Sequence, residues 1–242
     1  MVEAVSQSTS SRLEQLQADY NELAALDLLR VMTQQEFPGR IAVVSSFGAE
    51  SAILLHLLAQ VDPTVPVLFL NTGKLFGETM RYRDRLQERL GLTDLRAIGP
   101  HPADRDKLDP DGVLWSQNPD ACCDFRKTVP LSRALEGFDA WITGRKRFQT
   151  QERADMAPVE QVKDKFRINP LSNWTQQDLD AYMKDHRLPA HPLVREGYLS
   201  IGCMACTSKV APGEDPRAGR WRGQDKNECG IHLETFNDGG GI

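Results

Sequence analysis

The five cysteines are the residues of this 242-residue chain with the most evident chemistry. Four of them form two close pairs, Cys122 with Cys123 and Cys203 with Cys206, while Cys229 stands apart. A lone thiol with a histidine three residues downstream, here His232, is a candidate nucleophile. The alternative is a buried, inert cysteine, but the neighbours Lys226, Glu228 and Gly230 are polar or small. The sequence therefore favours a reactive Cys229.

The paired cysteines predict a site with four thiolates. CxxC is the usual clamp of zinc, an iron-sulfur cluster also takes four cysteines, and a thioredoxin-like CxxC would leave Cys122 and Cys123 unexplained. Adjacent side chains on a helix diverge by about 100°, which suits two corners of a cluster better than two bonds to one ion. Lys127, one helical turn after Cys123, would offset the negative charge of such a group.

The composition is that of an ordinary globular protein, with 40% apolar and 26% charged residues. A net charge of -5 argues against bulk nucleic-acid binding, so an anionic ligand has to be met by local cations. Residues 1–10 lack the basic flank and apolar core of a secretion signal, and no apolar run reaches membrane-spanning length. We therefore expect a cytoplasmic protein without a membrane partner, whose cysteine pairs serve metal or redox chemistry rather than disulfides.

The apolar patterning predicts an α/β fold. Short apolar runs at residues 41–44, 65–70, 95–98 and 141–143 alternate with helical segments, as in a parallel sheet with right-handed crossovers. A hairpin is expected at residues 159–169 and a capped helix at residues 175–186. We expect three parts: an N-terminal helical segment (1–37), an α/β domain (38–210) and a flexible glycine-rich tail (211–242) that carries Cys229.

Residues 45–51 (SSFGAES) connect the first strand with a helix, at the sheet edge where open parallel sheets bind ligands. Serine and glycine there allow backbone N–H groups and hydroxyls to meet an anion. The Walker pattern GxxxxGK[ST] is absent, so an NTPase of that type is not supported. Such turns are often small and polar for packing reasons alone, but four basic residues expected at the same edge favour an anionic ligand: Lys127, Arg145, Lys146 and Arg147.

Eight short motifs, taken in order, resemble the adenylyl-sulfate and phosphoadenylyl-sulfate reductase family. They are SSFGAES (45–51), FLNTGKLF (69–76), CCDFRK (122–127), TG (143–144), NPLS (169–172), IGCMAC (201–206), RAGRW (217–221) and ECGIH (228–232). The resemblance implies an adenine nucleotide α-hydrolase-like, Rossmann-like fold. The SGGxDS motif of ATP-hydrolysing relatives is not kept, which fits a substrate without a pyrophosphate.

The resemblance also implies roles for individual residues. Cys229 would be the catalytic nucleophile, and the four paired cysteines Cys122, Cys123, Cys203 and Cys206 would hold a [4Fe-4S] cluster. The residues expected to bind the nucleotide and its phosphosulfate are Ser45, Ser46, Phe47, Gly48, Thr72, Gly73, Lys127, Gly144, Arg145, Arg147, Arg217, Arg220 and His232. Asn71 departs from the aspartate that related sequences often have, which removes a charge beside the ribose.

The implied reaction is the reduction of adenylyl sulfate (APS) to sulfite and AMP. Cys229 would form an S-sulfocysteine, and thioredoxin or glutaredoxin would resolve it. Family members with the four cysteines mostly use APS, but the 3′-phosphorylated substrate (PAPS) stays an alternative because residues 145–147 supply extra cations. A non-catalytic metal-thiolate sensor would tolerate replacement of Cys229, and an ATP-dependent relative is disfavoured by the altered loop. The sequence leaves open whether the chain forms a homo-oligomer.

Overall fold

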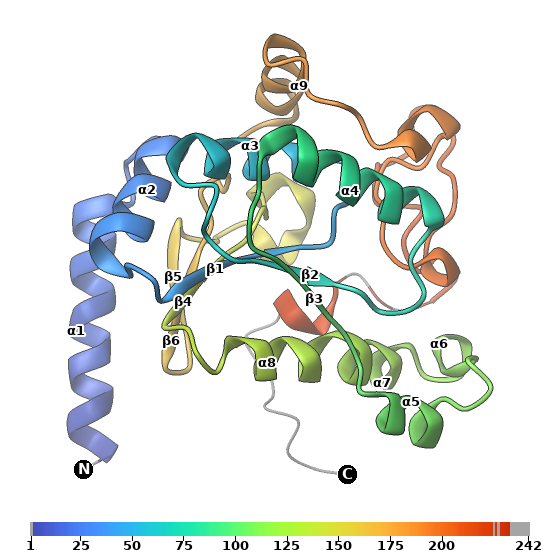
Figure 1. The fold of residues 1–242 in the computed structure, drawn as a ribbon, viewed down its shortest axis with the longest axis horizontal. Coiled ribbons are helices and arrows are strands. Elements are labelled where there is room, and N and C mark those ends of the chain that lie inside the picture. Colours follow the sequence, from blue (N-terminus) through green and yellow to red (C-terminus); the bar gives the residue numbers. More distant parts are fainter. Residues whose placement is uncertain (1, 225, 227, 233–242) are drawn as a thin grey trace.

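A six-stranded sheet forms the centre of the molecule (Figure 1). The computed structural model describes residues 2–224, 226 and 228–232, with side chains described from residue 11 onward and not at residue 232. The strands are β1 (Ile41–Ser45), β2 (Val67–Leu70), β3 (Leu95–Ile98), β4 (Ala140–Ile142), β5 (Val159–Val162) and β6 (Lys165–Ile168), in the order β3-β2-β1-β4-β6-β5. All neighbouring strands are parallel except β5, which pairs antiparallel with β6.

Helices cover both faces of the sheet (Figure 1). The α-helices are α1 (Val2–Tyr20), α2 (Ala25–Val31), α3 (Ser51–Val61), α4 (Gly77–Leu90), α5 (Pro102–Leu108), α6 (Leu114–Gln117), α7 (Pro119–Cys123), α8 (Val129–Leu135) and α9 (Gln176–Asp185). Two π-helical turns are η1 (Met32–Glu36) and η2 (Asp124–Thr128), and the 3-10 turns are η3 (Arg147–Gln149), η4 (Gln151–Arg153), η5 (Pro192–Glu196), η6 (Met204–Cys206) and η7 (Gly230–His232). The predicted alternation of strands and helices in a parallel sheet is confirmed.

Alternate residues of each strand enter two separate cores. Ile41 and Val43 of β1 pack with α2, α3 and α4, whereas Ala42 and Val44 pack with α8 and with apolar side chains from residues 221–231. This follows from the two-residue period of a strand, which sends successive side chains to opposite faces. In Figure 1, α2, α3 and α4 lie above the sheet, and α7 and α8 lie below it.

The predicted hairpin is present, and it extends the sheet. β6 pairs with β4 in parallel, and β5 forms the edge. Helix α1 lies against that edge, where the side-chain amide of Gln17 donates to the carbonyl of Val159 over 2.8 Å. A covered edge has fewer open backbone groups for a second chain to pair with. The N-terminal helical segment is therefore packed against the end of the sheet.

The strand order contains a point where the chain changes direction. From β1 the chain moves outward to β2 and β3, and it then returns to β4 on the other side of β1. In open α/β sheets, loops at the carboxyl ends of such strands diverge and leave a ligand-binding crevice. Ser45 ends β1, and Thr143 follows β4, so the loops after these residues border that crevice.

The described part of the predicted tail folds back onto the second face of the sheet. Trp221 and Ile231 are buried there, and the backbone N–H of Trp221 donates to the carbonyl of Cys206 over 3.1 Å. Mobility of the tail stays a prediction, and residues 233–242 lie outside the described part of the chain.

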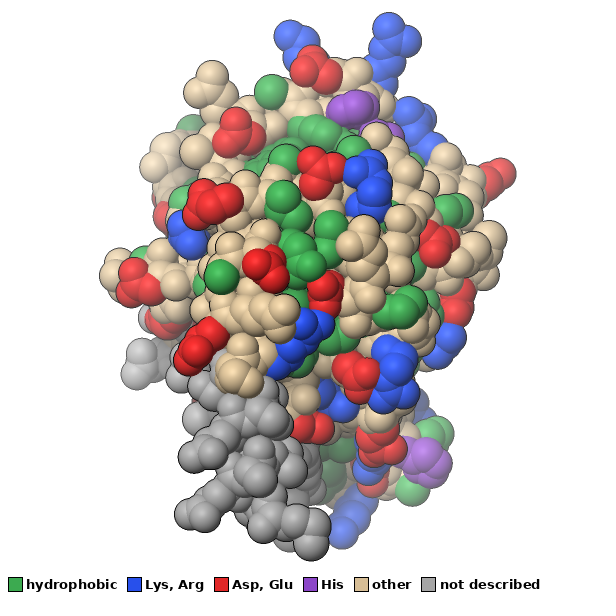
Figure 2. All heavy atoms as spheres, turned by 90° about the vertical axis from the view of Figure 1, so that its left-hand side faces the viewer, with side chains coloured by type: hydrophobic (Ala, Val, Ile, Leu, Met, Phe, Trp, Pro, Cys, Tyr) green, Lys and Arg blue, Asp and Glu red, His purple; other side chains and the backbone are tan. Residues whose placement is uncertain are grey.

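Acidic and basic side chains are interspersed on the face at the α1 end of the molecule (Figure 2). This mixture is in keeping with the modest net charge of -5. Among the described helices, none is both long and apolar enough to cross a lipid bilayer.

Candidate active site

A cavity of about 250 Å³ lies at the carboxyl ends of β1 and β4. Loops from distant parts of the chain close it: residues 199–203, 215–221 and 228–231. Six Lys or Arg side chains and three Asp or Glu side chains line it, namely Lys127, Arg145, Lys146, Arg153, Arg217, Arg220, Glu50, Asp215 and Glu228. The excess of cations at the N-terminus of α3 suits an anionic ligand.

The loop after β1 contributes Ser45, Ser46 and Gly48 to the cavity wall, and their contact with the nucleotide stays a prediction. Phe47 is different, because its side chain is buried in the core and packs edge-to-face against Phe69 at 5.3 Å between ring centroids. Its backbone adopts φ 51°, and the Ser45 hydroxyl accepts its N–H over 3.2 Å. The prediction that Phe47 contacts the substrate is therefore corrected: its ring anchors the loop from below and does not line the cavity.

The residues of the turn after β2 line two different cavities. Thr72 lines the cavity at β1 and β4, and its hydroxyl lies 3.2 Å from the Cys203 sulfur. Gly73 instead lines a neighbouring hollow with Asn71 and Arg126. The predicted contact of Gly73 with the nucleotide is thus not supported by its position, since the turn directs it to the other side.

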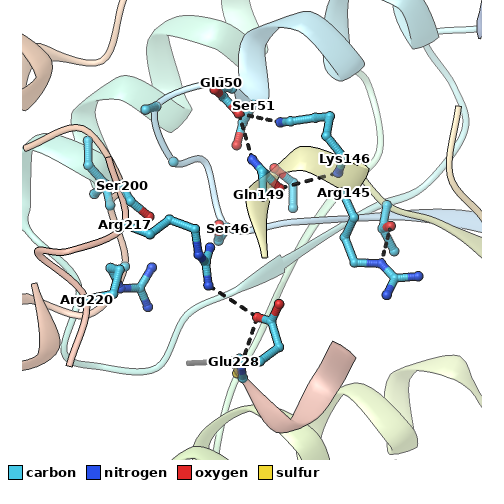
Figure 3. Close-up of a pocket in the computed structure, with 18 of the residues that line it drawn as sticks. Ser46, Glu50, Ser51, Arg145, Lys146, Gln149, Ser200, Arg217, Arg220 and Glu228 are labelled. Carbon is cyan, nitrogen blue, oxygen red and sulfur yellow. Dashed lines mark hydrogen bonds and ion pairs between the residues drawn. The ribbon is translucent and has the colours of Figure 1, made fainter. Parts of the chain in front are cut away.

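The residues after β4 approach the cavity in different ways. Gly144, Arg145 and Lys146 line it. Arg145 pairs with Glu160, and burial together with nearby Arg167 lowers its pKa to about 10. Lys146 pairs with Glu50 of the β1 loop, as Figure 3 shows. These two cations are therefore already neutralised by carboxylates.

Arg147 lies outside the cavity. Its side chain donates from Nε to the carbonyl of Met156 over 2.7 Å, at the start of the turn η3. The prediction that Arg147 binds the substrate is corrected for this reason: the 3-10 turn rotates it away from its neighbours Arg145 and Lys146, toward the chain that leads to β5.

Arg217 and Arg220 enter the cavity side by side (Figure 3), and their predicted contact with the phosphosulfate stays a prediction. The guanidinium of Arg220 stacks on the Trp221 ring at 4.4 Å and passes over Gly202, where a Cβ atom would lie only 2.4 Å from it. Its Nε is buried and has no hydrogen-bond partner within the described part of the chain. A buried donor without a partner is costly, so this position favours an incoming acceptor.

Cys229 lies in the cavity wall with 6% of its surface exposed. The Lys127 ammonium is 3.6 Å from the Cys229 sulfur and 3.7 Å from the Cys123 sulfur. A hydrogen bond from the Cys123 thiol lowers the pKa of Cys229, and the Lys127 and Arg220 charges lower it further against the effect of burial. Burial alone would lower the pKa of Lys127, but the sulfurs around it raise it overall. The geometry thus favours an ammonium beside a thiolate.

The four paired cysteines come from two places: Cys122 and Cys123 end α7, and Cys203 and Cys206 lie at the start and end of the turn η6. Burial raises the pKa of Cys122, and the negative potential of Cys203 and Cys206 raises it further. The Cys123 sulfur faces Cys229 and Lys127. Across the described residues, no three His, Cys, Asp or Glu side chains are arranged to hold a single metal ion.

The chemistry of these donors fits a four-thiolate group. Cys122, Cys123 and Cys203 are buried, Cys206 is half-buried, and all four are free thiols. Burial and the nearby Cys203 raise the pKa of Cys206, while the Lys127 and Arg220 charges act in the opposite direction and would offset charge on a thiolate-ligated group.

Two buried charged residues of the cavity, Glu228 and Arg153, had been given no role from the sequence. Glu228 belongs to the ECGIH motif, but no role was assigned to it, and Arg153 lies in a loop without any local signal. Both are buried, and they form an ion pair of 2.6 Å. The side chain of His232 lies outside the described part of the structure, so its predicted contact with the phosphosulfate stays a prediction.

Comparison with known proteins shows the family of this chain. Residues 40–209 match the phosphoadenosine phosphosulfate reductase domain family. The chain belongs to this family. An adenosine 5′-phosphosulfate reductase of Mesorhizobium japonicum is 51% identical over 90% of this chain and 86% of its own length, and one of Mycobacterium tuberculosis is 44% identical over 79% and 76%. These relatives are oxidoreductases by name.

Solved structures agree with the fold of the family. A phosphoadenylyl-sulfate reductase from Candida auris, in complex with phosphate, superposes with a TM-score of 0.68 at 25% identity and covers 82% of this chain and 96% of its own. An FMN adenylyltransferase from Candida glabrata gives a TM-score of 0.53 at 16% identity over 79% of this chain and 69% of its own. The expected adenine nucleotide α-hydrolase-like fold is thereby confirmed.

Proposed function

We propose that this protein reduces adenylyl sulfate to sulfite and AMP in assimilatory sulfate reduction. The observation that carries the proposal is the contact between Lys127 and Cys229 inside a cation-lined cavity at the point where the sheet order changes direction. The family and the names of the relatives support the same reaction.

In the first step the Cys229 thiolate attacks the sulfur of the sulfate group. An S–S bond forms, the S–O bond to the phosphate breaks, and AMP leaves with that electron pair, so that an S-sulfocysteine remains on the enzyme. The negative sulfate repels an approaching thiolate, and the positive charges of Lys127, Arg217 and Arg220 would reduce this repulsion. Serine hydroxyls at residues 45 and 46 and the N-terminus of α3 would hold the adenylyl phosphate.

In the second step an external dithiol of the thioredoxin or glutaredoxin type attacks the Cys229 sulfur. The S–S bond breaks, sulfite leaves with its electron pair, and the second thiol of the partner resolves the mixed disulfide, so that the dithiol supplies two electrons. Cys229 is buried in the docked position, so residues 228–231 have to move outward for this step, as lids do. We place the reaction in the cytoplasm, where such dithiols stay reduced.

We infer a preference for APS over PAPS. Binding the 3′-phosphate of PAPS would require a further cation near the ribose. In the sequence, the candidates for this cation are the basic residues 145–147. Arg145 is paired with Glu160, Lys146 is paired with Glu50, and Arg147 points away from the cavity. Steady-state rates with both nucleotides test this preference, and equal kcat/KM values would contradict it.

We further propose that Cys122, Cys123, Cys203 and Cys206 hold a [4Fe-4S] cluster, which supplies fixed charge next to the cavity. Lys127 contacts both the Cys123 and the Cys229 sulfur. With a cluster bound, Cys123 would have no proton to donate to Cys229, and the Lys127 ammonium would offset the charge of both sulfurs. Iron and acid-labile sulfide analysis should find about four of each per chain. Zinc without labile sulfide would contradict the cluster.

The nucleophile is tested with ³⁵S-labelled adenylyl sulfate. The unmodified protein should retain the label covalently in the absence of a dithiol and release it as sulfite when the dithiol is added. Cys229→Ser should retain none, because the serine hydroxyl stays protonated where the thiol ionises. Label retained by Cys229→Ser would show that another residue is the nucleophile.

A further inference from the structure

A buried ion pair that the proposed reaction does not use lies beside the cysteine pairs. Arg126 Nη2 is 2.6 Å from Asp109 Oδ2, and only 4% and 2% of the two side chains are exposed. Both residues line the hollow that Gly73 also borders. A buried ion pair gains little net stability once the desolvation of both charges is counted. What this pair connects therefore matters more than its own strength.

Arg126 connects the first cysteine pair with the turn after β2. It lies three residues after Cys123, in the turn η2 that continues α7. Its Nη1 donates to the carbonyl of Thr72 over 2.8 Å, and the Thr72 hydroxyl lies 3.2 Å from the Cys203 sulfur. A guanidinium is a rigid plane with several donors, so one side chain fixes the turn after β2 relative to the end of α7.

The same turn is bonded to the backbone of the second cysteine pair. Leu75 and Cys203 form an isolated antiparallel bridge, and the Met204 N–H donates to the Lys74 carbonyl over 2.7 Å. The Lys74 N–H donates in turn to the Thr72 hydroxyl over 3.2 Å. The turn after β2 therefore joins two cysteine pairs that are distant in the sequence.

Asp109 extends this connection to the start of α7. Its second carboxylate oxygen, Oδ1, accepts the Leu114 N–H at the start of α6 over 2.8 Å. Asn118 follows α6 and caps α7, and its carbonyl accepts the Cys122 N–H over 3.0 Å. Helices α6 and α7 lie next to each other (Figure 1). One carboxylate thus restrains both the arginine and the segment that leads into the first cysteine pair.

We propose that Asp109 and Arg126 are positioning residues that hold the two cysteine pairs relative to each other for a shared [4Fe-4S] cluster. Ligands from separate segments have to be brought together before one group can bind all of them. Arg126 fixes the turn that contacts Cys203, and Asp109 fixes Arg126 and the approach to Cys122. The inference rests on the proposed cluster and deepens it, because it names residues outside the four thiolates that orient them.

The test measures iron retention in the full-length protein, purified without oxygen. The readout is the rate at which the chelator bathophenanthroline removes iron, together with the Fe–S(Cys) stretching bands in the resonance Raman spectrum. Arg126→Met keeps the bulk of the side chain and removes the guanidinium. It should release iron about tenfold faster or more, the effect of losing a residue that orients metal ligands. The stretching bands should shift, which a purely stabilising residue would not cause.

Two controls separate positioning from charge and from stability. Arg133→Met removes an arginine that is 58% exposed and lies 3.6 Å from Asp104, so it should release iron at the rate of the unmodified protein. Leu55→Ala removes a fully buried side chain on the other face of the sheet and lowers the free energy of unfolding. It should also keep the unmodified rate and the unmodified stretching bands.

The partner residue gives a second variant. Asp109→Asn keeps the shape of the side chain and an acceptor for the Leu114 N–H, but it removes the charge that pairs with Arg126. It should release iron about threefold faster or more, as for the loss of one hydrogen bond. The double variant should release iron no faster than Arg126→Met alone, because both residues act through one contact.

An iron-release rate and stretching bands of Arg126→Met equal to those of Arg133→Met would overturn the inference. Equal release from Leu55→Ala and Arg126→Met would also overturn it, because the loss would then follow from general destabilisation. If Arg126→Met fails to fold, Asp109→Asn decides. Zinc without labile sulfide in the unmodified protein would overturn the cluster and this inference together, whereas the ³⁵S labelling of Cys229 tests the proposed reaction separately.

Discussion

The two faces of the sheet are built differently. The face covered by α2, α3, α4 and α9 is packed by aliphatic and aromatic side chains such as Leu55 and Phe69. The face covered by α7, α8 and residues 221–231 buries Cys123 and Cys229 among its apolar side chains, with the charged Lys127 between the two sulfurs.

The difference shows that one face of the sheet mainly stabilises the fold, while the other carries the reactive groups. An apolar face gains free energy from every buried side chain and has no group that can react. A face that buries an ammonium beside thiols is stable only while each charge keeps its partner. Substitutions on the first face should therefore change folding, and those on the second should change reactivity.

The largest effect is expected for Lys127→Met, which removes the ammonium between Cys123 and Cys229. The thiolate loses its neighbouring charge, so kcat/KM for adenylyl sulfate should fall about a hundredfold or more, as for the loss of one preorganised donor. Steady-state kinetics measures the change. Lys165→Met, a half-buried lysine that donates to the carbonyl of Phe138, serves as the control and should stay within about twofold. An unchanged rate for Lys127→Met would remove this residue from the mechanism.

On the apolar face, Leu55→Ala should cost about 3 kcal/mol of unfolding free energy, because it leaves a cavity where a fully buried side chain stood. Urea denaturation measures the loss, and the rate per folded molecule should not change. Leu23→Ala, at a position 37% exposed, should cost less than about 0.5 kcal/mol. A large loss of activity in folded Leu55→Ala would contradict the separation of the two faces.

A pH effect is expected from His191, which is fully buried beside α4. Its Nδ1 accepts the Leu193 N–H over 3.2 Å, its Nε2 lies 3.0 Å from the Thr79 hydroxyl, and burial lowers its pKa to about 4. Below the ordinary histidine pKa near 6.5, His191 is protonated in the unfolded chain but stays neutral in the folded chain until the pH approaches 4. Stability should therefore fall by about 2 kcal/mol from pH 7 to pH 5 through this residue.

Urea unfolding at several pH values measures that slope, and His191→Gln should flatten it. The window lies above the range in which most carboxylates titrate, so their contribution is small. An equally steep slope in His191→Gln would assign the pH effect to another group.

The smallest effect is expected for Thr175→Ala at the start of α9. The Thr175 hydroxyl caps the helix by accepting the Asp178 N–H over 3.3 Å, and Asp178 accepts the Thr175 N–H over 2.8 Å in return. Its loss should cost about 1 kcal/mol, read as a small drop in the thermal midpoint. The rate at which iodoacetamide modifies Cys229 should stay unchanged, because neither Thr175 nor Asp178 lines the cavity; a changed rate would link this cap to the site.

The local elements could be predicted from the sequence because their signals are local. The β-branched run at residues 41–44 and the apolar helix after it carry their own periodicity, and the Thr175 cap marks the start of α9. The family motifs also pointed to Cys229, Lys127, Arg217 and Arg220, which all line one cavity. Cys229 and Lys127 also had local signals in the sequence, whereas Arg217 and Arg220 were assigned from the family resemblance alone.

The tertiary structure decided which residues share the cavity. Arg147 lies only two positions after Arg145 in the sequence, but a 3-10 turn places it outside the cavity that Arg145 lines. Phe47 is buried in the core, whereas Ser45, Ser46 and Gly48 of the same loop line the cavity. Arg153 meets Glu228 across 75 residues of chain. The physical reason is that such contacts depend on the strand order and on where each loop folds back, and no local pattern encodes either. The sequence by itself determined which groups could react, and the tertiary structure determined which charges surround them.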